Sequence, residues 1–181
     1  MISRISMNDE NFRHFGGAVL DIEETSFPCP WSVNAFKEEL ANPLSHFFAL
    51  LRDDRLIAYI CFWMFAGEIH LLNIAVHPGE RRKGYGRQLL GEMIGMGLEN
   101  RIEAVWLEVR PSNQTARMLY EKMGFKEMGR RPRYYRETDE DAIIMCLSVK
   151  ETLTRLPRVP GPPMKEIPLT KAARISCPFD N

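Results

Sequence analysis

The chain has 181 residues, of which 45% are apolar and 27% charged, and this size and composition fit one soluble globular domain with a substantial core. Its 24 lysines and arginines balance 24 aspartates and glutamates, so the net charge gives no argument for a nucleic-acid or membrane partner. The N-terminus holds no apolar stretch of signal-peptide length, and no run reaches the length of a membrane span. We therefore expect a cytoplasmic protein, a monomer or weak dimer, without direct nucleic-acid or membrane contacts.

The cysteines also favour a reducing compartment. None of Cys29, Cys61, Cys146 and Cys177 stands in a CxxC or Cys/His spacing. Two of them lie in apolar runs that are typical of strands, where cysteine behaves as a small hydrophobic residue. We expect neither a disulfide framework nor a metal site.

The first part of the chain predicts a strand and two helices. Residues 2–6 alternate as a short strand does, and Asn8 is a suitable N-cap for a helix that runs to about Glu24. The prolines within residues 27–30 interrupt the helical pattern, and Ser32 can cap the next helix. The expected inner faces are Phe12, Phe15, Val19 and Ile22 in the first helix, and Val33, Phe36 and Leu40 in the second.

Three nearly continuous apolar runs follow, at 46–52, 56–66 and 68–77. Such runs are typical of strands covered on both faces, and residues 53–55 form a plausible hairpin turn between the first two. The remaining pattern predicts a helix to about residue 100, a strand at 104–110, a helix at 112–123 and strands at 125–135 and 142–149.

The order β-α-α-β-β-β-α-β-α-β-β predicts an α/β (α+β) fold with a mixed, mostly antiparallel, seven-stranded sheet flanked by about four helices. We expect one domain over residues 1–150. Residues 151–181 are proline-rich and show no helical or strand periodicity, so we expect a flexible tail there.

A basic glycine loop stands where the third apolar run ends and a helix begins. Its residues are Arg81, Arg82, Lys83, Gly84, Tyr85, Gly86 and Arg87. Unpaired N–H groups and the helix dipole make such a helix start attractive to anions, and glycines let the main chain approach a pyrophosphate. A dinucleotide fingerprint needs a third glycine where Leu89 stands, and no Walker-type Gly-Lys-Ser/Thr is present. Taken alone, the loop favours a solvated basic turn at a helix N-terminus over an anion site.

The context of this loop gives it a more specific meaning. The strand Leu71–Pro78 with the following Arg-x-x-Gly-x-Gly-x-x-Leu-Leu resembles motif A of the GNAT acetyltransferase superfamily, and Trp106–Asn113 with Leu119-Tyr120-Glu121 and Gly124-Phe125 resembles motif B. Other segments resemble the ribosomal-protein-alanine N-acetyltransferase branch of that superfamily. These are Phe27-Pro-x-Pro-Trp-Ser32, Asn73–Val76, Leu107–Arg110, Tyr134-Tyr135 and Glu140–Met145. The resemblance covers about residues 1–149.

The resemblance implies direct acetyl transfer from acetyl-CoA, without a metal, to the N-terminal alanine amine of a small-subunit ribosomal protein. It assigns the pantetheine arm to backbone groups of Ile74, Ala75 and Val76, and the pyrophosphate to the loop Arg81–Arg87. Asn113 would contact the coenzyme, although it is equally suited to cap a helix. The resemblance places Tyr134 and Tyr135 at the entrance for the acceptor peptide, and we also expect Trp31 and Glu24 to contact that peptide.

Glu108 is the candidate general base. It lies in an apolar strand, on the face opposite to Leu107 and its neighbours, and partial burial strengthens a carboxylate as a base. The alternative is a carboxylate that simply pairs with Arg110 or with an arginine nearer the C-terminus. The family motif favours the catalytic role.

Tyr120 is the candidate general acid, which would protonate the departing thiolate. Its helical spacing with Ala116, Leu119 and Met123 is also typical of a core tyrosine. Of two nearby histidines, His77 is expected to be a turn residue, and His70 could border the acceptor groove.

The chemistry of the acceptor favours an N-terminal amine. A free α-amine has a pKa of about 7.8 and a lysine side chain has a pKa of about 10.4, so deprotonating lysine costs roughly 3.5 kcal/mol more. Glu23 and Glu24 could attract a basic peptide to the site. The alternatives are a lysine or small-amine (polyamine or aminoglycoside) acetyltransferase, and a non-catalytic acetyl-CoA-binding module. A basic-loop nucleic-acid binder is disfavoured because no aromatic platform accompanies the loop.

Overall fold

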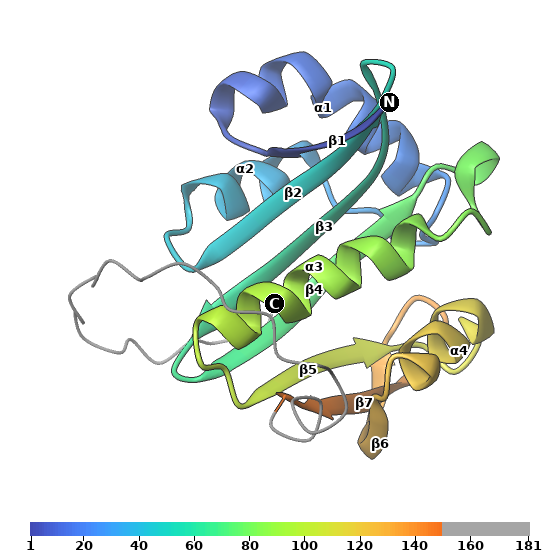
Figure 1. Ribbon diagram of the computed structural model, residues 1–181. Coiled ribbons are helices and arrows are strands. Elements are labelled where there is room, and N and C mark those ends of the chain that lie inside the picture. Colours follow the sequence, from blue (N-terminus) through green and yellow to red (C-terminus); the bar gives the residue numbers. More distant parts are fainter. Residues whose placement is uncertain (150–181) are drawn as a thin grey trace.

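The computed structural model describes residues 1–149; the tail expected from residue 151 onward lies outside them. Within these residues, four helices, one short 3-10 helix and a seven-stranded sheet follow in the predicted order (Figure 1). They are β1 Ile2–Ser6, α1 Asp9–Glu24, α2 Val33–Ala41, β2 Ser45–Arg52, β3 Arg55–Phe65, β4 Glu68–Val76, η1 Pro78–Glu80, α3 Tyr85–Glu99, β5 Ala104–Val109, α4 Gln114–Lys122, β6 Lys126–Tyr135 and β7 Glu140–Ser148.

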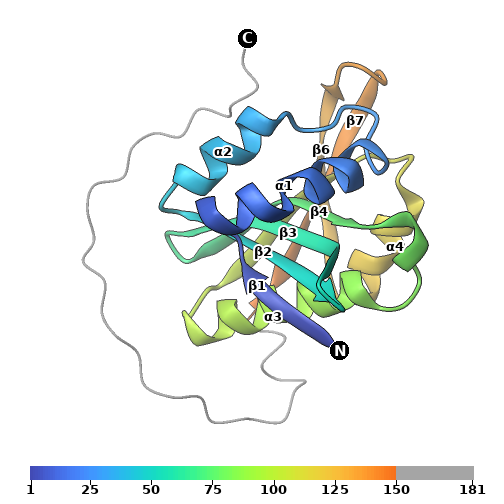
Figure 2. The same ribbon diagram turned by 90° about the horizontal axis from the view of Figure 1, so that it is seen from above.

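The sheet has the strand order β1-β2-β3-β4-β5-β7-β6. Every neighbouring pair is antiparallel except β4 and β5, which are parallel. The predicted mixed, mostly antiparallel sheet is therefore confirmed. Helices α1 and α2 cover one face of the sheet and α3 covers the other (Figures 1 and 2). No helix among residues 1–149 is long and apolar enough to cross a membrane.

Capping side chains fix where the first two helices begin, as predicted. The Asn8 side chain accepts a hydrogen bond from the backbone N–H of Asn11 at 2.8 Å, and Ser32 Oγ accepts one from Ala35 at 3.2 Å. The expected inner face of α2 is wrong at Val33, which is 40% exposed. The helix is anchored instead through Phe36, its one buried residue, which leaves the first turn facing solvent.

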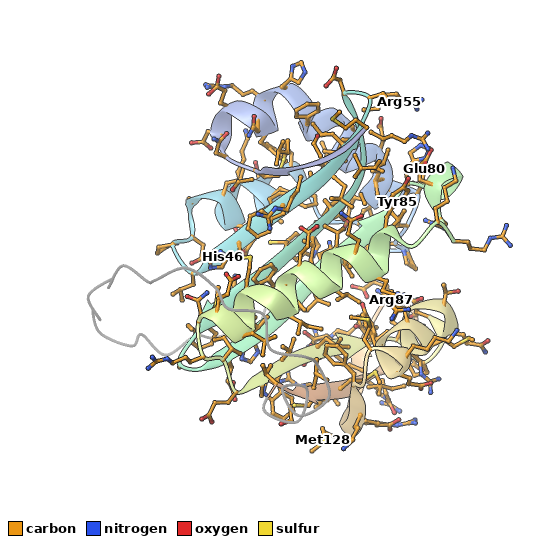
Figure 3. All side chains as sticks on the ribbon, viewed as in Figure 1. His46, Arg55, Glu80, Tyr85, Arg87 and Met128 are labelled. Atoms are coloured by element: carbon orange, nitrogen blue, oxygen red, sulfur yellow. The ribbon has the colours of Figure 1, made fainter. Side chains whose placement is uncertain are left out.

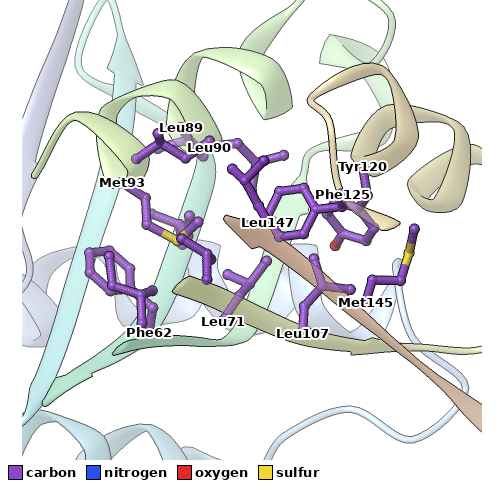
Figure 4. Close-up of a cluster of buried hydrophobic side chains, with 14 of the residues drawn as sticks. Phe62, Leu71, Leu89, Leu90, Met93, Leu107, Tyr120, Phe125, Met145 and Leu147 are labelled. Carbon is purple, nitrogen blue, oxygen red and sulfur yellow. The ribbon is translucent and has the colours of Figure 1, made fainter. Parts of the chain in front are cut away.

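Two hydrophobic cores lie on opposite faces of the sheet. The core under α3 and α4, called the α3-side core, combines residues of these helices with β3, β4, β5 and β7 (Figure 4). The core under α1 and α2, called the α1-side core, is rich in aromatic rings, and Phe36 packs against Phe47 and Tyr59 at ring-centroid distances of 5.6 and 5.8 Å. The central strand β3 contributes to both, which explains its nearly continuous apolar sequence.

Candidate active site

The parallel strands β4 and β5 separate halfway along their length. They pair from Glu68 with Ala104 to Leu71 with Leu107, and no further. Beyond this point β4 continues to Val76 beside β3 alone, and β5 continues beside β7 alone. Figure 1 shows the two strands diverging toward their C-terminal ends. The edge of β4 that faces β5 therefore has no strand partner over its last residues.

The register identifies which backbone groups face this gap. In an antiparallel pair, residues alternate between pointing both N–H and C=O at the partner and pointing both away. His77 N–H donates to Ile57 O at 2.9 Å, so the groups of Ala75, two residues earlier, also point at β3. Those of Ile74 and Val76 point into the gap. Of the three residues predicted to hold the pantetheine arm, Ile74 and Val76 thus have their backbone groups directed outward from β3.

A β-bulge in β4 begins at the same place. Cys61 of β3 pairs with Asn73 and the next residue, Phe62, pairs with Leu71, so Leu72 is an extra residue on β4. The alternation of side chains shifts there. Leu72 packs against the α1-side core, and the next residue, Asn73, bonds to Glu23 of α1, so two successive side chains face the same side of the sheet. The bulge therefore turns Asn73 toward α1.

The glycine loop joins β4 to α3 at the open end of the gap. Gly84 has a left-handed φ of 92° and is the N-cap residue of α3, with no side-chain cap. The first intrahelical bond runs from Gln88 N–H to Gly84 O, so the preceding N–H groups have no helical acceptor. Glu80, Tyr85 and Arg87 lie around this helix start (Figure 3).

The loop cations divide into two groups. Arg81 is tied back to the protein, with Nε donating to Val76 O at 3.1 Å and Nη2 to Ser26 Oγ at 2.9 Å. Lys83 Nζ donates to Glu80 Oε2 at 3.0 Å. Arg82 and Arg87 are exposed and form no ion pair with another described residue. Arg82 and Arg87 are therefore better placed than Arg81 and Lys83 to bind an external anion.

Gly86 lies at a close contact between α3, α4 and β4. A Cβ at this position would stand 3.3 Å from Leu119 Cδ2 of α4 and 3.8 Å from Val76 Cγ2. Its absence lets the start of α3 approach both α4 and the end of β4. The anion-binding helix start is thereby held beside the gap.

Glu108 lies on β5 just past the last pairing with β4, on the face that α1 and α2 occupy farther along the sheet. Its side chain is 26% exposed, and Arg131 Nε of β6 stands 3.1 Å from its Oε1. The predicted partial burial is confirmed, and so is the pairing with an arginine nearer the C-terminus. The ion pair holds the carboxylate in place without closing it off from solvent.

Tyr120 is buried in the α3-side core at 5% exposure, with its ring 5.7 Å from that of Phe125 (Figure 4). The core position suggested by its helical spacing is therefore confirmed. Burial raises the pKa of its phenol above the ordinary value, and the nearby Tyr135 adds to this. The phenol is protonated at neutral pH even at the ordinary tyrosine pKa of about 10, so it can serve as a proton donor.

Tyr135 connects the two catalytic candidates electrostatically. Its pKa is raised to about 12, first by burial and then by the charge of Glu108, and the same tyrosine contributes to the raised pKa of Tyr120. The Arg110 guanidinium lies 4.2 Å from the centre of the Tyr135 ring. Tyr134 stands at right angles to Tyr135, with ring centroids 5.1 Å apart. The β6–β7 hairpin thus brings both predicted tyrosines to the Glu108 end of the gap.

Hydrogen bonds tie this hairpin to the start of α4. Glu140 accepts from the Ser112 backbone N–H and hydroxyl, each at 2.9 Å. Next to it, Asn113 caps α4 by accepting from Ala116 N–H at 3.2 Å. The capping alternative for Asn113 is therefore confirmed, while its contact with a coenzyme stays a prediction. His77 caps η1 through a 3.1 Å bond from Gly79 N–H, so it is the expected turn residue.

On the acceptor side, the structure separates the two neighbouring acids at the end of α1. Glu24 is exposed, whereas Glu23 is buried. The expectation that Glu23 attracts a peptide from solvent is therefore wrong. Trp31 is half-buried, and its ring packs 5.3 Å from that of Phe36. His70, on β4 before the gap, bonds to Glu68 at 3.0 Å and stacks on Phe65.

Sequence reasoning missed the network around Glu23. Its carboxylate accepts hydrogen bonds from Tyr59, Asn73 and the backbone of Trp31. One signal was present in the sequence, because Glu23 follows Val19 by four residues and so extends the apolar stripe of α1. An acid on such a stripe needs buried donors.

Comparison with known proteins places this arrangement in a family. Residues 17–125 match the Acetyltransferase (GNAT) family. The chain belongs to this family.

Individual GNAT relatives cover nearly the same part of the chain. It is 37% identical over 134 residues to the ribosomal protein bS18-alanine N-acetyltransferase of Escherichia coli K12, covering 73% of this chain and 90% of the relative. It is 39% identical over 135 residues to the protein of the same name from Salmonella typhimurium, with the same two coverages of 73% and 90%.

Solved GNAT structures agree with the fold. The crystal structure of the ribosomal-protein-S18-alanine N-acetyltransferase from Escherichia coli superposes with a TM-score of 0.74 at 34% identity, covering 82% of this chain and 94% of that one. Ard1 from Thermoplasma volcanium gives a TM-score of 0.73 at 21% identity, over 81% and 97% of the two chains. The second likeness shows the shared fold.

Proposed function

We propose that this GNAT protein transfers the acetyl group of acetyl-CoA to the N-terminal α-amine of a small-subunit ribosomal protein that begins with alanine. The observation that carries the proposal is the gap between β4 and β5, which has backbone groups without a strand partner on one side and Glu108 on the other. The names of the relatives that match over most of their length support the choice of acceptor.

The chain's own groups fit a coenzyme A arm. Amide groups of the pantetheine would pair with the backbone of Ile74 and with the N–H of Val76, which have no strand partner on that side; the Val76 carbonyl accepts from Arg81. The pyrophosphate would meet the free N–H groups at the start of α3, together with Arg82 and Arg87. One outward-facing N–H of β4 would donate to the acetyl oxygen and stabilise negative charge as it develops.

The transfer itself forms one bond and breaks one. The amine nitrogen attacks the thioester carbonyl carbon, the carbon–sulfur bond breaks, and coenzyme A leaves as a thiolate. Glu108 takes the proton from the amine, directly or through a water, and Tyr120 gives its proton to the departing sulfur. Arg131 fixes the orientation of Glu108, and the phenol of Tyr120 is protonated at neutral pH when the thiolate forms.

An α-amine suits this arrangement better than a lysine. A single partly exposed carboxylate serves as the base, and an α-amine, with a pKa of about 7.8, is already substantially neutral near pH 7 to 8. The half-buried tyrosines Tyr134 and Tyr135, together with Trp31 and Glu24, would border the bound peptide.

Glu108→Gln in the full chain tests the catalytic assignment. It should lower kcat by about 100- to 10,000-fold, the usual contribution of a general base, and leave the Kd for acetyl-CoA unchanged. Glu127→Gln is the matched control, because Glu127 also pairs with an arginine on β6, at 2.9 Å, but stands on the edge strand β6, which β7 separates from β5. Equal activity of the two variants would contradict the role of Glu108.

Tyr120→Phe tests the acid separately. The ring contact with Phe125 is preserved, so the unfolding temperature should change little while kcat falls. An unchanged kcat would show that Tyr120 has only a packing role.

A further inference from the structure

Glu23 is a carboxylate in the protein interior, only 1% exposed, at the last turn of α1. An ionised carboxylate loses its hydration there and needs donors to replace it. Burial raises the pKa of Glu23, and the hydrogen bonds to it act in the opposite direction. Because burying this carboxylate is unfavourable, the groups that bond to it are expected to have a structural role.

Its donors come from three different elements. Trp31 N–H, in the loop between α1 and α2, donates to Oε1 at 2.7 Å. Asn73 Nδ2 of β4 stands 3.1 Å from both carboxylate oxygens, and the Tyr59 hydroxyl of β3 donates to Oε2. The carboxylate thus joins the acceptor-side loop to the strand proposed to hold acetyl-CoA.

The point of attachment on β4 is where the gap opens. The extra residue Leu72 turns Asn73 toward α1, and the next residue, Ile74, directs its backbone groups into the gap. A hydrogen bond to Asn73 therefore constrains the backbone immediately before the acetyl-binding segment. The Asn73 Oδ1 atom is buried and has no hydrogen-bond partner among the described residues, so Nδ2, facing Glu23, supplies the side chain's only bonds there.

A second tie holds the other end of the same loop. Arg81 links Ser26, at the beginning of the α1–α2 loop, to the Val76 carbonyl at the end of β4. The loop is therefore attached twice, at Ser26 and at Trp31, to the end of β4 that lies beyond its pairing with β5. Only the attachment through Glu23 is buried.

We propose that Glu23 is a positioning residue for the acceptor, whose carboxylate sets the α1–α2 loop at a fixed distance from the acetyl-binding segment of β4. This inference rests on the proposed function, because it takes that loop to border the acceptor peptide. In this role Glu23 does not attract a basic peptide by long-range electrostatics but positions the loop through short hydrogen bonds. The two roles differ in their dependence on salt and on the charge of the peptide.

Glu23→Gln keeps the size of the side chain and tests the proposal. Its one oxygen can still accept a bond, but its amide nitrogen cannot accept from Asn73 or Trp31. We expect the KM for an alanine-first peptide to rise about tenfold, the effect of losing one hydrogen bond to a charged group. The KM for acetyl-CoA should stay within about twofold, since the loop cations and helix start are untouched. The rise should be the same at low and high salt, and for peptides with arginine or alanine at the second position.

Asp21→Asn is the matched control, because Asp21 is an exposed acid of α1 two residues before Glu23 and has no proposed contact with either substrate. It should leave both KM values unchanged. Tyr59→Phe offers a milder change, which removes one donor but keeps the ring against Phe36. If Glu23→Gln folds poorly, Tyr59→Phe takes its place in the assay, and it should give a smaller rise in the peptide KM.

Amide hydrogen exchange of Trp31 gives a readout that does not need the acceptor. In Glu23→Gln with coenzyme A present, this amide should exchange at least about tenfold faster than in the wild type, because its acceptor is weakened. Wild-type inactivity on α-amine peptides would contradict the proposed function, while faster exchange at Trp31 would still support the tie. Unchanged exchange, an unchanged peptide KM, or an equal rise in the KM for acetyl-CoA would overturn the positioning role.

Discussion

Gly84 provides the sharpest test of the anion-binding loop. It has a left-handed φ of 92° and directly precedes the first residue of α3. A Cβ at Gly84 would meet nothing within 4 Å, so an alanine there is opposed by backbone conformation alone. The left-handed conformation costs a non-glycine residue about 1–2 kcal/mol. If coenzyme A binds only to the loop in this conformation, Gly84→Ala should weaken its Kd by about 5- to 30-fold.

Gly91→Ala separates this effect from a general effect of alanine. Gly91 lies inside α3, also with nothing within 4 Å of a Cβ, and its φ is not positive. Alanine is favoured over glycine in a helix by about 1 kcal/mol, so this variant should melt at a higher temperature and bind coenzyme A normally. Titration calorimetry with coenzyme A and thermal unfolding measure both quantities. Unchanged coenzyme A affinity in Gly84→Ala, or an equal loss in Gly91→Ala, would refute the reasoning.

Two further predictions concern packing and pH. In Gly97→Ala the new Cβ would stand 3.1 Å from Ile69 Cδ1, and overpacking of about 2 kcal/mol, the middle of its usual range, outweighs the helix-propensity gain of about 1 kcal/mol. Its unfolding temperature should fall by several degrees, whereas Gly95→Ala, with open space, should not lose stability. The bond from Lys83 lowers the pKa of Glu80, so its stabilisation is present above the ordinary glutamate pKa and disappears as the pH falls through the lowered value. Thermal unfolding of Glu80→Gln should therefore differ from wild type at pH 7 and converge with it in acid; a gap independent of pH would contradict this.

Local sequence signals predicted most of the fold. Caps such as Asn8 and Ser32 and the apolar runs of the central strands act over a few residues, so their outcome can be inferred without the tertiary structure. The position of Glu108 on the open face of β5 also followed from simple alternation along a strand. The family motif then indicated which of these residues carry chemistry.

Other features depend on contacts between distant segments. The bulge at Leu72 is set by pairing with β3 and changes the face to which the following residues point. The burial of Glu23 depends on donors that are 36 and 50 residues away, Tyr59 and Asn73. The tying of Arg81 to Ser26 spans 55 residues. No local pattern specifies such pairings, so sequence reasoning treated Glu23 as a surface charge and all the loop cations alike.

Thiol release from acetyl-CoA distinguishes an N-terminal α-amine from the other possible acceptors. Two peptides would be compared with the full chain, one beginning with a free alanine amine and one blocked at its N-terminus with an internal lysine. Release with the first peptide only, abolished by Glu108→Gln, is the predicted result. Release with the blocked peptide would indicate a lysine acetyltransferase instead, and no release with either would contradict the account in favour of a small-amine substrate or a non-catalytic role.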